Sequence, residues 1–370
     1  TVNPVLWDFY TTGAGAAYKK EVPSVTGQGR LAANEAPQSA YTQTEFDSMA
    51  EYRDAAVIVI GRSGSESMDL PVEYLSFTQE ERALIEMAEG RFDKIVLVLN
   101  VTNPINMTEI ARYDIDAVLW VGALGQEGAY AVGEALNGTV NPSGHLVDTW
   151  AVDPAGSPAA ANLGDYTITN SNVTSGNKYI VYAEGIYVGY RYYETRYEDA
   201  VLGQGNAGDY DYDAQVVYPF GYGLSYTDFT WSDYKMTETA NGFALNVTVK
   251  NTGSAAGKDV VQAYLQSPYT DYDKANGIEK SAVELVGFAK TDILQPGESQ
   301  TVTIDVDKST LKVFDAYGEG TYIVEAGDYY LTAAANAHAA ANNILAAKGA
   351  AVDGSADFTA LYTQAATDTK

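Results

Sequence analysis

Three short, fully apolar runs constrain the fold of this chain more than any other feature of its sequence. They cover residues 56–60 (AVIVI), 95–99 (IVLVL) and 117–121 (AVLWV). Runs of this length are typical of strands buried on both faces, as in a parallel sheet. Helical patterns alternate with them at residues 44–52, 78–89 and 126–136. This order predicts right-handed βαβ crossovers and a mostly parallel sheet with helices on both faces.

The helix expected after the first run has the clearest start and stop signals. Thr78 and Glu81 have the spacing of a capping box, in which each side chain bonds the other residue's backbone N–H. Leu84 and Met87 continue one apolar face, and Gly90 is a typical helix stop.

The helical period disappears after Phe229. Short alternating segments follow at residues 243–253, 258–268, 283–294, 300–307 and 328–335, which is typical of an immunoglobulin-like β-sandwich. We therefore expect an α/β sandwich domain over residues 1–217, an all-β immunoglobulin or fibronectin III-like sandwich over 218–338, and a linker over 339–370.

Two other segments lack clear periodicity. Residues 1–42 are expected to be irregular, and residues 153–213 to form a long connector. The connector is rich in tyrosine over residues 179–195. Such side chains either stack on sugars or pack at the interface between domains, and we favour packing at that interface.

The loop after the first apolar run holds the first candidate for chemistry. Glu66 lies six residues beyond Ile60, and Asp69 lies three residues further. Ligands of open α/β sheets bind just outside the carboxyl ends of the strands. Because most glutamates in Gly/Ser loops are solvated surface charges, the pattern alone leaves Glu66 only a candidate.

Charge and composition exclude several classes of function. The net charge of −27 and pI near 4.2 argue against nucleic acid or an anionic membrane as a partner, whereas a neutral sugar meets no repulsion. The chain has no cysteine, and only His145 and His338 could serve a histidine-based metal site or catalytic triad. We expect His145 to be structural. No run of eighteen apolar residues predicts a membrane span, and the compartment, cytoplasmic or secreted, is left open.

Several motifs in order resemble glycoside hydrolase family 3, the β-glucosidase and β-xylosidase family. The segment VIVIGRSGSESMD resembles its acid/base loop, IVLVLNVTNPINM its next strand, and GALGQEGAYAVGEALNGTVNPSGHL its GQEG helix and the following turn. The segments IYVGYRYYET and YPFGYGLSYTDF resemble its junction with a fibronectin type III-like domain. The resemblance runs from about Val2 to Ala347.

The resemblance implies part of a retaining, exo-acting β-glycosidase, most closely a β-glucosidase. Glu66 would be the catalytic acid/base, with Arg62 and Asp69 contacting substrate or bracing the loop. The nucleophile would lie on a (β/α)8 barrel polypeptide outside this chain, so the expected partners are that barrel and a β-linked glycoside. The chemistry needs no metal or organic cofactor, and a homo-oligomer of the assembled enzyme is left open.

Besides the missing barrel, two departures from the family accompany this resemblance. The family's GEG is replaced by Ser65-Glu66-Ser67, and the first βα unit of the α/β domain would precede Thr1. The tail NAHAAANNILAAKG resembles the connector of members in which the barrel follows these domains.

Two other classes of function compete with the enzyme. A non-catalytic carbohydrate-binding or scaffolding protein could keep only these accessory domains. A flavodoxin-like nucleotide binder is disfavoured, because GRSGSES is not a GxGxxG fingerprint and does not directly open a capped helix.

Overall fold

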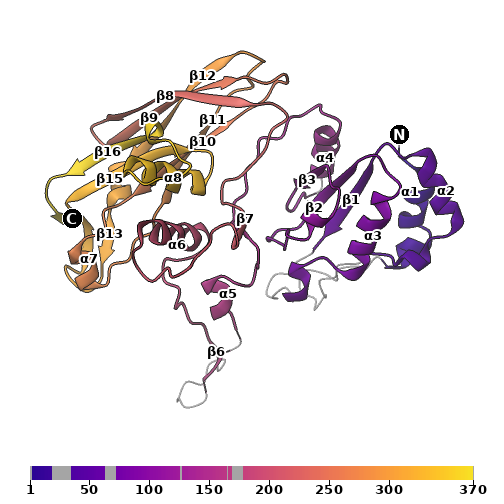
Figure 1. Ribbon diagram of the computed structural model, residues 1–370, viewed down its shortest axis with the longest axis horizontal. Coiled ribbons are helices and arrows are strands. Elements are labelled where there is room, and N and C mark those ends of the chain that lie inside the picture. Colours follow the sequence, from indigo (N-terminus) through magenta and orange to yellow (C-terminus); the bar gives the residue numbers. More distant parts are fainter. Residues whose placement is uncertain are drawn as a thin grey trace. The chain divides into compact units, whose positions relative to one another are not determined.

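The structure is a computed structural model, and it describes residues 2–18, 35–62, 72–125, 127–164, 166–168 and 178–369. The chain forms two compact units (Figure 1). Unit 1 contains Thr1–Asn137 and Trp150–Pro154, and unit 2 contains Gly138–Thr149 and Ala155–Lys370. The segment from 155 to 217, which we expected to belong to the α/β domain, thus clusters with the β-rich unit. Within the described ranges, no helix has the length and apolarity needed to cross a membrane.

Unit 1 is built on the predicted parallel sheet. Its strands are β1 (Ala56–Gly61), β2 (Ile95–Asn100) and β3 (Ala117–Trp120), in the order β1-β2-β3. Ile58 pairs with Leu97, and Leu97 with Val118. All three predicted strands are confirmed, and their carboxyl ends share one edge.

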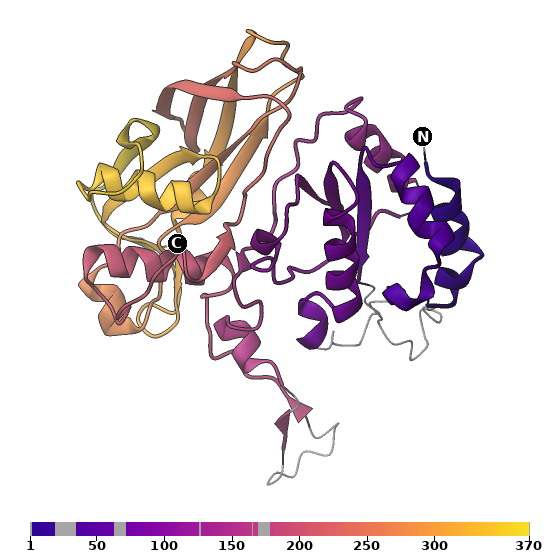
Figure 2. The ribbon, with the colours of Figure 1, turned by 45° about the vertical axis from the view of Figure 1, so that its right-hand side comes forward.

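Helices α1 (Pro4–Thr11), α2 (Gln43–Glu51) and α3 (Gln79–Glu89) pack together on one side of this sheet (Figure 2). Each contributes to one buried cluster, through Phe9, Met49 and Met87 respectively. Helix α1 corrects the prediction that residues 1–42 are irregular. Asn3 caps α1 by accepting from two backbone N–H groups, which is a local signal strong enough to start a helix.

The other face of β1 is not buried, contrary to the prediction. Val57 is 49% exposed and Val59 is 59% exposed, whereas Ile58 and Ile60 are buried beneath the helices. Helix α4 (Gly128–Leu136) follows β3 and ends at Asn137, as predicted. Strand β1 therefore has one covered and one open face. It is also an edge strand of the described sheet, because the strand order is β1-β2-β3.

Unit 2 contains the predicted β-sandwich. One sheet has the order β12-β9-β8 and the other β11-β10-β15-β16, and all the pairs are antiparallel. The strands are β8 (Phe229–Glu238), β9 (Gly242–Asn251), β10 (Val260–Gln266), β11 (Glu284–Lys290), β12 (Ser299–Asp307), β15 (Gly327–Ala334) and β16 (Thr359–Gln364). The inward-facing residues form one core, exemplified by Leu245, Val261, Ile304 and Leu331.

Two predictions for unit 2 are wrong. The connector contains a 13-residue helix, α6 (Tyr190–Leu202), which lies against α8 (Ala337–Ala347). The segment expected to be a linker contains most of α8 and also β16, which extends the sheet by pairing with β15. Some tyrosines of the connector pack within unit 2: Tyr190 stacks on Phe220 with ring centroids 4.5 Å apart. Others do not pack, since Tyr182 is 77% exposed.

Shorter elements complete the two units. They are β4 (Trp150–Ala151), α5 (Pro158–Asn162), β5 (Tyr166–Thr167), β6 (Lys178–Tyr179), β7 (Val216–Tyr218), α7 (Asp271–Asn276), β13 (Val313–Asp315), β14 (Thr321–Val324) and β17 (Asp368–Thr369). In unit 2, His145 lies between two loops, with Nδ1 2.5 Å from the oxygen of Gly221.

Candidate active site

The candidate site lies at the carboxyl edge of the parallel sheet. In register, Gly61 at the end of β1 pairs with Asn100 at the end of β2, and Leu99 pairs with Trp120 at the end of β3. The loops that follow these strands consequently leave the sheet from the same edge. Ligands of open α/β sheets bind at such an edge.

Arg62 follows β1 directly and is only 5% exposed. Its Nη1 lies 2.6 Å from Oε1 of Glu81, and its Nη2 lies 2.8 Å from Oε2. The other N–H groups donate at 2.9 Å to the main-chain oxygens of Gly61, Tyr74 and Ser76. A guanidinium has five N–H donors, and all five are used here.

These contacts tie together the chain on either side of residues 63–71. Gly61 precedes residues 63–71, whereas Tyr74 and Ser76 follow them. Rigid bidentate pairing is a property of arginine that lysine cannot reproduce. Arg62 therefore holds the two ends of the loop at a fixed separation.

Arg62 and the contacts of its guanidinium form a clamp, which we call the Arg62 clamp. Glu81 connects this clamp to helix α3. Its carboxylate accepts from the backbone N–H of Thr78 at 2.8 Å, and its own N–H donates to the Thr78 hydroxyl at 3.2 Å. The predicted capping box is thus present. It serves two purposes, because the glutamate that caps the helix also neutralises the buried Arg62.

The loop after β2 braces the same region. The N–H of Asn106 donates to the oxygen of Leu75 at 2.6 Å, and Ile105 is fully buried. The indole N–H of Trp120 donates to the oxygen of Val101, also at 2.6 Å. The ends of all three strands are therefore joined through their loops.

Unit 1 also contains a titratable cluster that the sequence did not reveal. The hydroxyl of Tyr10 donates to Oε1 of Glu35 at 2.7 Å and also bonds the hydroxyl of Tyr41. Burial raises the pKa of the Glu35 carboxyl, and the charge of Glu81 adds to this effect. The cluster joins α1 to the segment before α2.

The structure reaches only part of the predicted site. Glu66 and Asp69 lie outside the described residues. Arg62 is described, and the prediction that it contacts substrate is not supported, since the described residues use all of its donors. Sequence reasoning missed its partner Glu81, although the capping box had already marked that residue. Among the described residues, no cluster of three or more histidine or carboxylate side chains could hold a metal ion.

Comparison with known proteins identifies relatives of both units. The model described as the glycosyl hydrolase family 3 C-terminal domain matches residues 10–190, and the fibronectin type III-like domain matches residues 259–337. A β-glucosidase from Ruminococcus albus is 35% identical over 297 residues, covering 79% of this chain and 28% of that protein. β-Glucosidase A from Butyrivibrio fibrisolvens is 32% identical over 324 residues, covering 76% and 36%.

Solved structures agree with these matches. β-Glucosidase 3B from Thermotoga neapolitana, in complex with α-D-glucose, superposes with a TM-score of 0.73 at 26% identity, covering 99% of this chain and 44% of that one. This chain thus spans less than half the length of each of these relatives. It belongs to glycoside hydrolase family 3, and contains the family's C-terminal domain joined to a fibronectin type III-like domain.

Proposed function

We propose that this chain supplies the acid/base residue of a retaining, exo-acting β-glucosidase, and that the nucleophile lies on a (β/α)8 barrel outside it. The observation that carries this proposal is the Arg62 clamp, which braces the chain on both sides of the loop that contains Glu66. The β-glucosidases that it resembles, and its coverage of only part of their length, support the same conclusion.

Glu66 has two tasks in this mechanism. Retaining hydrolysis uses two carboxyl groups roughly 5–5.5 Å apart, of which one attacks the anomeric carbon and the other protonates the departing oxygen. Glu66 is the proton donor in the first step. In the second step it removes a proton from the water that releases the sugar. A neighbouring negative nucleophile favours the protonated starting form by raising the pKa of Glu66.

The other two loop residues have separate roles in this proposal. Arg62 is a positioning residue, because it acts through the loop and not through the sugar. A shift of about 1 Å in a catalytic group costs roughly 100-fold in rate. Holding the two ends of the loop in place therefore protects the rate. Asp69 is proposed to contact the substrate. No metal or organic cofactor takes part.

Substitution of Glu66 tests the proposal in the enzyme assembled from this chain and its barrel. Glu66→Gln should lower turnover of cellobiose, which has a poor leaving group, by about 10²–10⁴-fold. Aryl glucosides with good leaving groups should lose much less in their first step, and azide should restore product release as glycosyl azide. Unchanged turnover of cellobiose would remove the assignment.

A matched control comes from the far end of the same loop. Glu73 is exposed in the 3-10 turn Val72–Leu75, so Glu73→Gln should leave the turnover of both classes of substrate unaffected. The 370-residue chain alone should not hydrolyse either class. Hydrolysis by the purified chain without a barrel would contradict the proposed division of labour.

A further inference from the structure

Unit 2 contains a cleft that the proposed glycosidase chemistry does not use. Its volume is about 770 Å³, within the range of roughly 300–1,000 Å³ that is usual for small-molecule sites. Residues from α6, the segment after β10, and the beginning of β15 line it, together with Lys348 just after α8. All of these residues belong to unit 2.

An unpartnered acceptor lies in the wall of this cleft. Gln266 is only 6% exposed, and its Nε2 donates to both carboxylate oxygens of Glu198, at 2.9 and 3.0 Å, and to the oxygen of Ala282 at 2.5 Å. These three acceptors fix the orientation of the amide. Its Oε1 has no hydrogen-bond partner among the described residues. A buried polar atom without a partner is costly. Because this oxygen exposes less than 1 Å² of surface, a ligand hydroxyl reaches it only when the groups that cover it move aside.

The lysines of the lining are already paired within the protein. Each ammonium nitrogen, Nζ, lies close to a carboxylate oxygen. The distances are 3.0 Å from Lys348 to Glu198, 3.1 Å from Lys274 to Asp271 and 2.9 Å from Lys280 to Asp273. Because these ammonium groups have carboxylate partners, the cleft is poorly suited to an anionic ligand.

The carboxylates of the lining are occupied too. Asp199 accepts from the amide of Gln204 at 3.2 Å, and Asp328 accepts from the hydroxyl of Thr363 at 2.7 Å. Glu198 accepts from Gln266 and Lys348. Asp199 and Asp328 accept from neutral donors, so their remaining lone pairs can accept from the hydroxyl groups of a neutral ligand. A cation is the competing ligand that the titration below must exclude.

Two tyrosine rings offer apolar surface that such a neutral ligand could also contact. Tyr269 is 56% exposed and Tyr330 is half-buried, and both line the cleft. The Nζ of Lys274 lies 5.7 Å from the ring centroid of Tyr269, and the Nζ of Lys348 lies 5.3 Å from that of Tyr330. Large apolar rings with polar edges suit the mixed surface of a pyranose.

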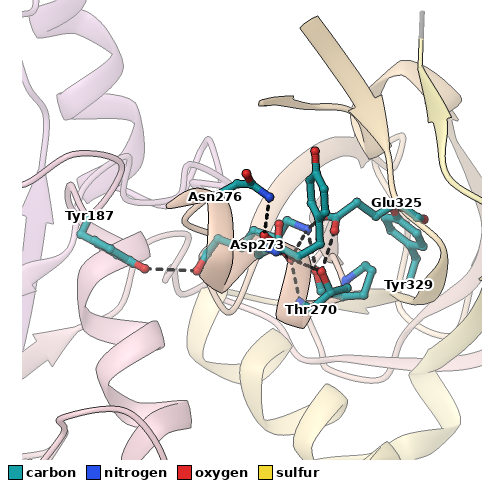
Figure 3. A network of polar contacts seen from close by, with 9 residues as sticks. Tyr187, Thr270, Asp273, Asn276, Glu325 and Tyr329 are labelled. Carbon is teal, nitrogen blue, oxygen red and sulfur yellow. Dashed lines mark hydrogen bonds and ion pairs between the residues drawn. The ribbon is translucent and has the colours of Figure 1, made fainter. Parts of the chain in front are cut away.

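A buried polar network holds one wall of the cleft in place (Figure 3). Lys280 donates to the oxygen of Pro268 at 2.7 Å and pairs with both Asp273 and Glu325. The hydroxyl of Thr270 donates to Oε1 of Glu325 at 2.7 Å. Pro268 and Lys280 both line the cleft, and the side chains of the network are buried. The wall next to Tyr269 is therefore preorganised, which reduces the entropic cost of binding.

We propose that this cleft binds a neutral oligosaccharide, with Oε1 of Gln266 accepting from a sugar hydroxyl and Tyr269 packing against a pyranose face. The site is non-catalytic. It rests on unit 2 alone and does not depend on the assignment of Glu66.

Calorimetric titration of the 370-residue chain tests this site. The probes are cellotetraose and maltotetraose as neutral sugars, with inorganic phosphate and spermidine as anionic and cationic comparisons. At least one of the two sugars should bind with a stoichiometry of one, and phosphate and spermidine should not. Binding of neither sugar would overturn the proposal, as would tighter binding of phosphate or spermidine.

Variants then locate the binding. Tyr269→Ala should weaken the affinity about fivefold or more, whereas Tyr317→Ala, which removes an 83% exposed tyrosine outside the cleft, should change it less than about twofold. Gln266→Met keeps the side-chain volume and should weaken the affinity about tenfold. If Gln266→Met does not fold, Tyr269→Ala still decides, because its side chain is largely exposed.

A fourth variant separates this site from the proposed glycosidase function. Glu66→Gln should leave sugar binding by the 370-residue chain unchanged. Equal affinities for the wild-type chain, Tyr269→Ala and Tyr317→Ala would refute the cleft as the binding site, whatever the outcome of the Glu66 experiments.

Discussion

Arg62 and Glu81 form a bidentate ion pair in the interior of unit 1, although 19 residues separate them in sequence. They are 5% and 3% exposed respectively. One residue begins the loop after β1, and the other caps the helix to which that loop leads. The pair therefore couples the geometry of the proposed catalytic loop to the stability of helix α3.

Breaking this pair on one side should destabilise unit 1 strongly. Glu81→Gln leaves the buried guanidinium without a counter-charge, which costs about 3–5 kcal/mol of unfolding free energy. Urea denaturation followed by circular dichroism measures the change. Arg53→Gln is the control, since the Arg53–Asp93 pair is exposed and is expected to contribute at most about 1 kcal/mol. Equal losses in the two variants would contradict the argument.

The network beside the cleft predicts an asymmetric response to substitution. One ammonium, that of Lys280, faces the carboxylates of Asp273 and Glu325. Lys280→Met leaves two buried carboxylates together and should cost about 3–5 kcal/mol. Glu325→Gln leaves a balanced pair and should cost roughly 1–3 kcal/mol. Denaturation of the two variants at pH 7 compares them, and a larger loss in Glu325→Gln would be inconsistent with this charge balance.

The Glu35 carboxyl should make stability fall as pH rises. Burial raises its folded-state pKa above the ordinary value of about 4.5, so the native state holds this proton more tightly than the unfolded chain. Its contribution is fully present below pH 4.5 and is lost as pH rises through the folded pKa. Glu35→Gln stays neutral, so its unfolding free energy should decline less than that of the wild-type chain across this range. Parallel pH profiles for the two proteins would exclude the effect.

Strand β16 should be essential to unit 2, contrary to its interpretation as a linker. Tyr362 packs edge-on against Phe243 with ring centroids 4.9 Å apart. Tyr362→Ala should therefore cost about 2 kcal/mol or more. Leu361→Ala, on the exposed face of the same strand, should cost less than about 1 kcal/mol. Thermal unfolding distinguishes the two, and a neutral Tyr362→Ala would support a linker after all.

Local signals explain which parts of the fold could be predicted. Helix α3 was found because its capping box and stop lie within the helix and its immediate flanks. Helix α6 was missed because its buried polar residues find partners far away in the sequence: Glu194 accepts from Tyr212, and Glu198 accepts from Gln266. No periodicity in a tyrosine-rich segment reveals such contacts. The sequence singled out Arg62 as a substrate contact or a brace of the loop, but only the folded chain identifies its partner Glu81.

The open face of β1 has a consequence for how this chain behaves in isolation. No described residue forms a ladder with the outer side of β1, and Val57 and Val59 lie unprotected beside that free backbone. An unpaired strand edge with apolar side chains beside it readily pairs with strands of other molecules. The purified chain should therefore self-associate through this unpaired edge at high concentration. Val59→Lys should keep it monomeric.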